Sequence, residues 1–573
     1  MKNQELAQIF DQIADALELK GETGFRVLAY RKAARVLAEL TEDVAELERE
    51  NRLETIPGIG SGIAKKIQEY LATGKMQKLD EVTSGLEPGL FVLLKIPGVG
   101  PKTVRLLHQA LGVKDLESLK KVLTDGSAAK LPGMGEKKVK NILQSIQTAE
   151  SSGERMYLNE AYELAEAIVS YIKRANVAEQ VTFAGSLRRG KETIGDIDIL
   201  ASGKNPTAII NCFIEYPQKQ QVISAGDTKA SILVKTNSGL RQVDLRVVRE
   251  EEFGAALQYF TGSKDHNVAL RTLAQKMGLK ISEYGVFRGE KKIAGKRETE
   301  VYRALGLSYI EPELREDRGE IEAAKAGRLP RLVQLSDIKS DLHIHTDASD
   351  GISSLEEIVT AAQKRGYTHI AIAEHSVSAG YAGGLTEEEL LRRCETIDRL
   401  NEKLNGFRVL KAAEVDITPE GKLDYSDKTL RQLDLVVASI HQAFNREATK
   451  RICFAIEHPL VQIIGHPSGR LINKRPGYDI DLEKVIEWAA KFKKILEINS
   501  FYARLDLNDV WAKKAKDAGV LLAVNTDAHA VADLSWMRYG VITARRAWLE
   551  KSDVVNCLNL NQLLKLLKSI SRL

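Results

Sequence analysis

The C-terminal part of the chain repeats one pattern, in which short apolar runs alternate with stretches of helical character. The runs follow one another at a spacing of about 30 residues, and each is long enough for a buried strand. Parallel strands need a helical crossover between them, and these spacings leave room for one. The pattern therefore predicts parallel βα units that form a barrel. The runs span residues 341–345, 370–375, 409–416, 435–441, 461–466, 495–499 and 521–529.

Nearly every run ends in a side chain that can bind a metal ion. Active sites of βα barrels form at the C-terminal ends of the strands, so these side chains should meet at one mouth. Imidazole and carboxylate ligands together suit Zn²⁺, Mn²⁺ or Fe²⁺. The candidate ligands are too many for one ion, so we expect two or three ions. They are His343, His345, Asp350, His375, Glu414, His441, His466, Asp527 and His529.

Two other histidines act as controls because they precede their strands. His369 and His458 should lie at the opposite end of the barrel, and we exclude them as ligands. Glu497 and Asn499 lie on the sixth run, and we interpret both as structural residues.

Three aspartates in the middle of the chain form a second candidate metal site. Successive strand residues point to opposite faces, so Asp196 and Asp198 share one face and leave the isoleucines beside them to the core. The same alternation places Asp244 on the polar face of residues 243–247. If the two strands pair, three carboxylates meet, and their repulsion calls for counter-ions such as Mg²⁺.

A glycine turn precedes these aspartates. Backbone amides of Gly185 and Ser186 can hold a triphosphate, and Arg189 can add a guanidinium. Divalent cations beside a bound triphosphate are the parts required for phosphoryl transfer.

Three segments near the N-terminus share the pattern apolar–Pro–Gly–apolar–Gly, each followed by a helix rich in lysine or arginine. The pattern predicts a tight turn that opens into a helix N-terminus, where unpaired amides attract anions. The segments resemble the helix-hairpin-helix element, which holds phosphates without reading sequence. Their glycines, which would let a DNA backbone approach closely, are Gly58, Gly60, Gly98, Gly100, Gly133 and Gly135.

Composition narrows the class of protein. The chain has 573 residues, 43% hydrophobic and 28% charged, which suits three or four globular domains. No apolar run is long enough to span a membrane, and the N-terminus lacks a signal region. The four scattered cysteines are typical of a reducing, cytoplasmic setting. A net charge of +4 gives little general attraction to nucleic acid, so DNA binding must depend on local geometry.

At the three aspartates and the glycine turn, the chain resembles the palm of the DNA polymerase X family. The resemblance implies a template-directed DNA polymerase that fills gaps in DNA repair, including base excision repair. It further implies that the three aspartates are catalytic and hold Mg²⁺ or Mn²⁺, and that gapped or primed DNA and dNTPs are the partners. The implied nucleotide-binding residues are Gly185, Ser186, Arg189, Gly195, Tyr259, Phe260, Gly262, Asn267 and Arg271.

The first 80 residues resemble the small lyase domain of the same family. Arg26, Tyr30 and Lys66 match its 5′-phosphate and Schiff-base positions, so Lys66 could attack an abasic-site aldehyde. Lys66 can equally be a solvated or phosphate-touching helix residue. Gly62 and Glu54 stand where lyase-active relatives carry lysines, which argues against the lyase role.

The C-terminal pattern resembles the polymerase-and-histidinol-phosphatase (PHP) domain, a distorted seven-stranded barrel with a trinuclear metal site. That resemblance implies metal-dependent phosphodiester hydrolysis, with 3′→5′ exonuclease action on single-stranded 3′ ends and incision at abasic sites. Over essentially all 573 residues the chain resembles bacterial X-family polymerases that carry this domain.

The sequence thus predicts a multidomain α+β and α/β protein, acting as a monomer without a membrane partner. We expect a lyase-like helical domain at 1–83, a fingers-like helical domain at 84–150 and a nucleotidyltransferase-type palm at 151–250. A thumb at 251–310, a linker at 311–336 and a (β/α)7 PHP barrel at 337–573 should follow.

Two other interpretations remain open. The C-terminal domain could be a small-molecule phosphomonoesterase fused to a nucleotidyltransferase, because the ligand set does not distinguish the substrates. The protein could also be a DNA-binding scaffold with inert metal sites, although the intact set of three aspartates argues against this.

Overall fold

The structure is a computed structural model, and it describes all residues except 1, 23, 41–43, 95, 97–98, 137, 141, 144–145, 147–154, 237 and 572–573. The chain forms two compact units, which are Met1–Gly153 with Ser238–Leu240 and Glu154–Asn237 with Arg241–Leu573. None of the helices in the described ranges combines the length and apolar character needed to cross a lipid bilayer.

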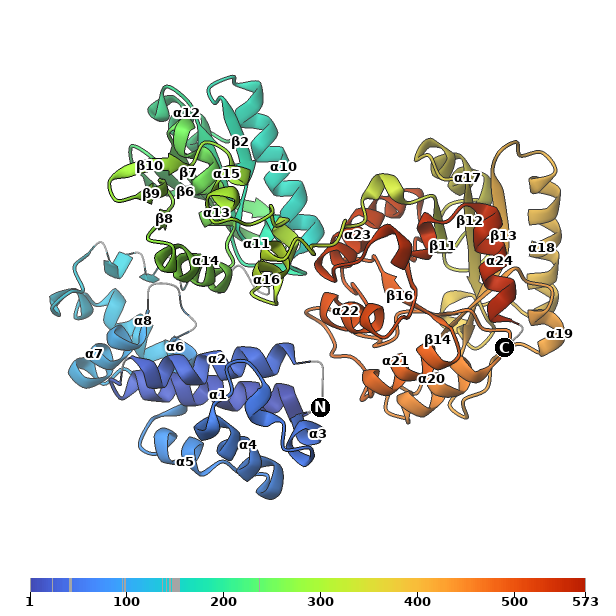
Figure 1. Cartoon of the computed structure of the whole chain (residues 1–573), viewed down its shortest axis with the longest axis horizontal. Helices are drawn as coiled ribbons and strands as arrows, with labels where there is room; N and C mark the ends of the chain where they lie inside the picture. The colour runs from blue at the N-terminus through green and yellow to red at the C-terminus, as the bar shows by residue number, and fades with distance from the viewer. Residues whose placement is uncertain are drawn as a thin grey trace. The chain divides into compact units, whose positions relative to one another are not determined.

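The first unit is helical. Its longest helices, α1 (Lys2–Leu19) and α2 (Phe25–Glu39), lie side by side (Figure 1). Phe10 and Leu37 are fully buried between them, as the apolar face of an amphipathic helix requires. The other helices are α3 (Val44–Arg49), α4 (Ser61–Thr73), α5 (Gln77–Thr83), α6 (Pro88–Leu93), α7 (Pro101–Leu111) and α8 (Leu116–Thr124).

Two of the three predicted hairpins have a turn that the described residues cover, with the expected backbone. Gly58 and Gly133 adopt φ values of 104° and 75°, a region that favours glycine. Gly60 and Gly100 are the N-caps of α4 and α7, and neither supplies a side-chain cap. Gly135 precedes a further helical stretch, whereas Gly98 lies outside the described residues. The amides at these helix starts therefore remain available to an anion.

The palm is a five-stranded sheet in the order β2-β4-β7-β6-β5. Side chains of β4 and β7 alternate as predicted, with Ile197, Ile199 and Leu245 buried against the helices. The strands are β2 (Gln180–Phe183), β4 (Ile197–Ser202), β5 (Lys219–Ala225), β6 (Lys229–Thr236) and β7 (Gly239–Val248). Around them lie β1 (Met156–Tyr157), α10 (Leu158–Arg174), α11 (Gly185–Arg188), β3 (Thr193–Ile194) and α12 (Pro206–Ile214).

A thumb and a connector follow the palm. The thumb contains α13 (Phe253–Thr261), α14 (Lys264–Lys276), β8 (Lys280–Ser282), β9 (Gly285–Arg288), β10 (Lys291–Ala294) and α15 (Glu298–Ala304). The connector contains η4 (Pro312–Leu314), α16 (Glu320–Lys325) and η5 (Leu335–Asp337). His266 of α14 is fully buried and lies 2.6 Å from Glu320 of α16, so the connector is anchored on the thumb.

All seven predicted C-terminal strands are present, and neighbours pair in parallel in chain order. The amide of His345 donates to the carbonyl of Ala528 at 2.9 Å, which joins the first strand to the segment after the last one. The result is a nearly closed barrel. Its strands are β11 (Ser340–Ile344), β12 (His369–His375), β13 (Arg408–Asp416), β14 (Leu435–Ser439), β15 (Ile463–Ile464), β16 (Ile495–Asn499) and β17 (Leu522–Asn525).

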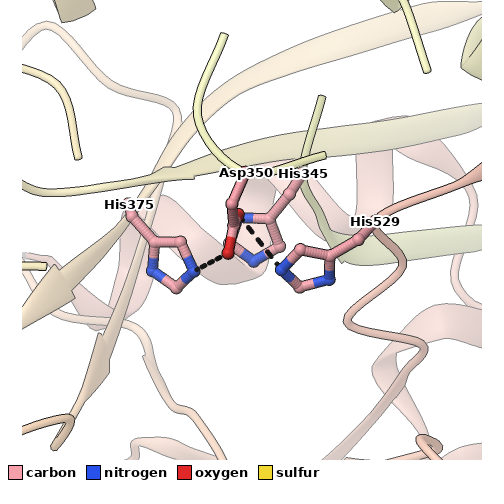
Figure 2. Close-up of side chains that lie close together, drawn as sticks. All are labelled: His345, Asp350, His375 and His529. Carbon is pink, nitrogen blue, oxygen red and sulfur yellow. Dashed lines mark ion pairs between the residues drawn. The ribbon is translucent and has the colours of Figure 1, made fainter. Parts of the chain in front are cut away.

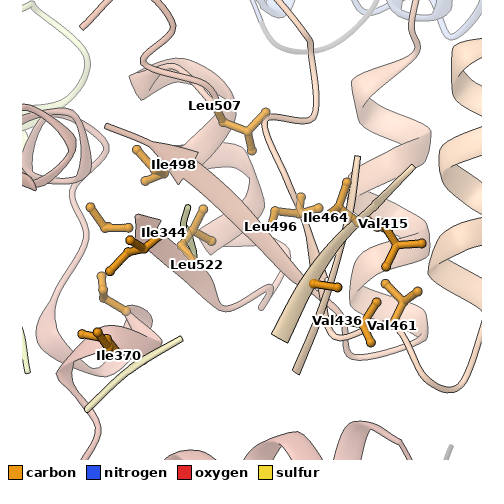
Figure 3. Close-up of a cluster of buried hydrophobic side chains, with 14 of the residues drawn as sticks. Ile344, Ile370, Val415, Val436, Val461, Ile464, Leu496, Ile498, Leu507 and Leu522 are labelled. Carbon is orange, nitrogen blue, oxygen red and sulfur yellow. The ribbon is translucent and has the colours of Figure 1, made fainter. Parts of the chain in front are cut away.

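Helices surround this barrel (Figure 1). Apolar side chains such as Ile370, Val436 and Leu496 fill the layer between strands and helices (Figure 3). A second cluster of buried residues lies inside, where Leu563 and Leu567 of the last helix meet residues from the strands. The helices are α17 (Leu355–Lys364), α18 (Glu387–Asn401), α19 (Asp427–Leu430), α20 (Ala448–Glu457), α21 (Leu482–Lys491), α22 (Asp509–Asp517), α23 (Met537–Arg546) and α24 (Leu560–Ile570).

Palm and barrel share an apolar cluster. Ile472, Leu505 and Tyr539 of the barrel are buried together with the palm core. The hydroxyl of Tyr157 in the palm also donates to the carbonyl of Ile472 at 2.9 Å. These two parts of the second unit are thus packed against each other. The predicted fold class is confirmed, whereas the exact domain boundaries stay a prediction.

Candidate metal centres

Five histidines among the candidate ligands surround one buried carboxylate, that of Glu414. Glu414, at the end of β13, lies 2.9 Å from a ring nitrogen of His375 and 2.9 Å from one of His466. Its oxygens also lie 3.4 Å from His343 and 3.3 Å from His441. Five neighbouring strands position these side chains, so the cluster exists only in the assembled barrel.

A second group of ligands lies beside the first. Asp350 is 3.6 Å from His375 and 3.2 Å from His529. The ring of His345 lies between the rings of these two histidines (Figure 2). Nε2 of His345 is 3.2 Å from Asp527. Three subsets of ligand atoms are compact enough for an ion: His345, Asp350, His375 and His529; His343, His345 and Asp527; His375, Glu414 and His441.

The chemistry of these groups fits bound cations. Both ring nitrogens of His345 are buried and have no hydrogen-bond partner in the described chain, a costly arrangement unless an ion is coordinated. Burial, reinforced by the neighbouring His375, lowers the pKa of His345 to about 3. This imidazole is therefore neutral at pH 7, as a metal ligand must be.

Glu497, interpreted above as structural, contacts a ligand directly. It lies 2.8 Å from Nδ1 of His343 and accepts a hydrogen bond from the amide of His466 at 2.8 Å. Asn499 donates to Asp527 at 3.0 Å. A carboxylate on the far nitrogen of a histidine fixes its tautomer and orientation. Sequence analysis missed this role, although position on a barrel strand was the available signal.

The two control histidines lie where they were predicted. His369 is the first residue of β12, at the start of the strand, and its Nδ1 is 2.9 Å from the hydroxyl of Thr368. His458 precedes β15 and lies 3.2 Å from Asp427. Neither is part of the ligand cluster.

In the palm, β4 and β7 pair in parallel with Asp198 opposite Asp244. Burial, together with the charges of Asp196 and Asp244, raises the pKa of Asp198 to about 7. Burial and Asp244 also raise the pKa of Asp196. Crowded carboxylates with raised pKa values are suited to divalent cations.

The third palm carboxylate is held by its own neighbours. Asp244 accepts hydrogen bonds from the hydroxyl of Ser231 and from Gln242, the latter at 3.0 and 3.1 Å. Among the described residues, the compact ligand subsets include no palm aspartate. The three carboxylates are thus adjacent but less tightly gathered than the ligands of the barrel.

A pocket of about 380 Å³ opens beside Asp196 and Asp198. It is lined by eight of the nine residues predicted to bind nucleotide; Gly195 is the exception. Lys264 also lines the pocket and was not predicted. A Cβ atom on Gly185, which has φ 62°, would lie 2.1 Å from an oxygen of Asp198, so no larger residue fits there.

Arg189 lines this pocket, and residues outside the palm contact it on the side away from the pocket. Its Nε lies 3.1 Å from Glu316 of the connector, and Arg546 of the barrel lies 3.0 Å from the same oxygen. A Cβ on Gly190 would lie 2.1 Å from Ile542 of α23. The predicted triphosphate loop therefore packs directly on a barrel helix.

The predicted lyase residues do not form a closed site. Nζ of Lys66 donates to the carbonyl of Gly62 at 2.9 Å and lies 5.9 Å from the ring centre of Tyr30. Tyr30 is buried against Phe10, while Arg26 is largely exposed and pairs with Glu22.

Comparison with known families gives five matches between residues 1 and 505. The matching models are a helix-hairpin-helix domain at residues 1–76, a SAM-like helix-hairpin-helix tandem at 91–148, DNA polymerase beta palm at 155–247, DNA polymerase beta thumb at 256–316 and a PHP domain at 341–505.

Individual relatives agree with this organisation. DNA polymerase/3′-5′ exonuclease PolX of Bacillus subtilis (strain 168) is 39% identical over 99% of this chain and 100% of its own length. DNA polymerase lambda of Rattus norvegicus is 27% identical over 55% of this chain and 56% of its own. A probable phosphatase of Thermoanaerobacter sp. (strain X514) is 34% identical over 38% of this chain and 89% of its own. The chain therefore belongs to the bacterial DNA polymerase X family, whose members join an X-family polymerase core to a C-terminal PHP domain.

Proposed function

We propose that this protein is a DNA-directed DNA polymerase that fills gaps and also trims DNA 3′ ends at a separate metal centre. The observation that carries the proposal is the presence of two ligand clusters on separate scaffolds, one on the palm sheet and one in the barrel. The full-length likeness to a polymerase/exonuclease supports both halves.

In the palm, Asp196, Asp198 and Asp244 would hold Mg²⁺ or Mn²⁺. Such ions lower the pKa of a primer 3′-hydroxyl and neutralise charge on the triphosphate. Amides at Gly185 and Ser186, with the guanidinium of Arg189, orient the triphosphate in the pocket. The other residues of the pocket surround the rest of the nucleotide. They are Tyr259, Phe260, Gly262, Lys264, Asn267 and Arg271.

In the barrel, the nine ligands would hold two or three Zn²⁺, Mn²⁺ or Fe²⁺ ions. These ions supply Lewis-acid activation of water and of the scissile phosphate. Glu497 fixes the orientation of His343, and Asn499 fixes that of Asp527. We propose single-stranded 3′ ends as the substrate, with abasic sites as a second one.

The hairpin turns of the first unit would hold the phosphate backbone of gapped or primed DNA through helix N-termini. We propose that the protein works as a monomer. A lyase role for Lys66 draws no support from the open arrangement around it, and cytoplasmic location stays a prediction.

The second candidate is a small-molecule phosphomonoesterase in the barrel, which the probable phosphatase among the relatives favours. Two assays of the purified protein distinguish between the two candidate functions. A labelled primer on gapped DNA should be extended with dNTPs, and a single strand should be shortened from its 3′ end in Mn²⁺. Hydrolysis of small phosphomonoesters without shortening of DNA would support the second candidate.

A further inference from the structure

The turn after β16 carries a set of aromatic and cationic side chains beside the barrel ligands. The amide of Phe501 donates to Asn499 at 3.0 Å, and Asn499 in turn donates to the ligand Asp527 at 3.0 Å. The turn continues to Arg504, whose amide donates to the carbonyl of Phe501 at 2.7 Å. Two hydrogen bonds thus connect this turn to the metal site.

Arg504 lies close to the ligands without a full set of partners. Its Nε is 3.9 Å from an oxygen of Asp527, and its side chain is 18% exposed. This Nε is buried and makes no hydrogen bond within the described residues. Asp527 is too far from this Nε for a hydrogen bond, and the fork of guanidinium donors matches a phosphate.

An aromatic pair lies next to this arginine. The ring of Phe501 is 4.8 Å from that of Trp536, with 31° between the planes. Trp536 ends the segment Val531–Trp536, which begins two residues after the ligand His529. Both rings are half-buried. Trp536 thus follows two ligands along the chain, and Phe501 follows the strand whose Glu497 and Asn499 contact ligands.

Packing against the palm explains the position of Trp536 but not that of Phe501. Tyr502 and Trp536 pack on the apolar cluster of the palm, but among the described residues that cluster does not include Phe501. Phe501 therefore lies at the edge of the aromatic group, and its backbone amide bonds to Asn499, the residue that donates to the ligand Asp527. Bases of single-stranded DNA stack on such rings, and this interaction tolerates any sequence.

We infer that Arg504, Phe501 and Trp536 form the binding site for the last nucleotides of a single-stranded DNA 3′ end. Arg504 binds a backbone phosphate beside the metal ions, and the ring of Phe501, supported by Trp536, stacks with a base. This inference rests on the proposed nuclease function. A small phosphomonoester would use Arg504 but would have no use for the rings.

Two 5′-labelled single strands of equal length test the inference in Mn²⁺. One ends in two thymidines, and in the other these two residues carry 5,6-dihydrothymine, a saturated base that is not planar and stacks poorly. The unmodified protein should shorten the thymidine strand with a KM about tenfold lower or more, the effect of one stacked base. Phe501→Ala should remove this difference between the strands while still shortening both. Trp488→Ala is the matched control, because Trp488 lies on α21 and bonds to Glu457, and it should keep the difference.

Arg504→Gln should lower kcat/KM about 10- to 100-fold on both strands, because it removes a charged hydrogen bond to phosphate, and Arg504→Lys should recover part of the loss. Equal KM values for both strands in the unmodified protein, or a preserved difference in Phe501→Ala, would overturn the inference. Failure of the unmodified protein to shorten either strand is a separate result, which contradicts the nuclease function itself.

Discussion

Arg546 of the barrel donates a hydrogen bond to the backbone carbonyl of Arg189 in the palm at 2.7 Å. The same guanidinium reaches Glu316, which also pairs with the side chain of Arg189. Both the backbone and the side chain of the predicted triphosphate ligand are thus fixed by groups outside the palm. The barrel and connector thus support the predicted nucleotide pocket on one side.

Weakening this support should impair nucleotide binding. Glu316→Gln removes the charge between Arg189 and Arg546 but keeps an acceptor, so we expect KM for dNTP to rise about tenfold, equivalent to ~1.4 kcal/mol. The measurement is steady-state primer extension. Arg538→Ala is the control, because Arg538 lies on the same helix and pairs with Glu166 at a half-exposed site. An unchanged KM in Glu316→Gln would show that Arg189 needs no support from this side.

Glu497 should set the metal affinity of the barrel. In Glu497→Gln the acceptor for Nδ1 of His343 loses its charge, and we expect metal affinity to fall about 10- to 100-fold. Competition with a chelator measures this affinity. Asp398→Asn is the control, because Asp398 pairs with Lys411 away from the ligands. Equal affinity in Glu497→Gln and the parent would mean that the contact has no effect on the site.

Glu298 should stabilise the thumb in a pH-dependent way. Burial alone would raise the pKa of Glu298, but the guanidiniums of Arg315 and Arg188 lower it from 4.5 to about 2. A carboxyl with a lowered pKa stabilises the fold above its unfolded value, and this contribution fades as pH falls from 4.5 towards 2. Urea unfolding at pH 7 and pH 4 should therefore show a larger penalty for Glu298→Gln at pH 7. The same penalty at both values would contradict this ionisation.

Much of the fold followed from two periodicities. Alternation along residues 197–199 and 243–247 predicted both the buried face and the carboxylate face of the palm strands, and Asp198 does lie opposite Asp244. Spaced apolar runs predicted all seven barrel strands. Both patterns are local, so they can be recognised without knowing which strands are neighbours.

The features that could not be predicted from the sequence depend on tertiary geometry. His466 and Asp527 adopt φ values of 27° and 54°, which is a strained conformation for residues other than glycine. Histidine and aspartate at these positions do not indicate such a conformation. In the sequence, Ile472 and Tyr539 resemble ordinary core residues of the barrel. Only the structure shows that both are buried in the core of the palm. Lys264 reaches the palm pocket from α14, an element separate from the glycine turn and the aspartates, which sequence spacing does not predict.

The two metal centres should work independently of each other, and one pair of variants tests this most directly. Asp198→Ala and His345→Ala are assayed on one gapped substrate, with primer extension and 3′ shortening measured side by side. We expect Asp198→Ala to lose nucleotide addition and keep shortening, and His345→Ala to do the reverse. Loss of both activities in either folded variant would contradict the claim, because one coupled site would then serve both reactions.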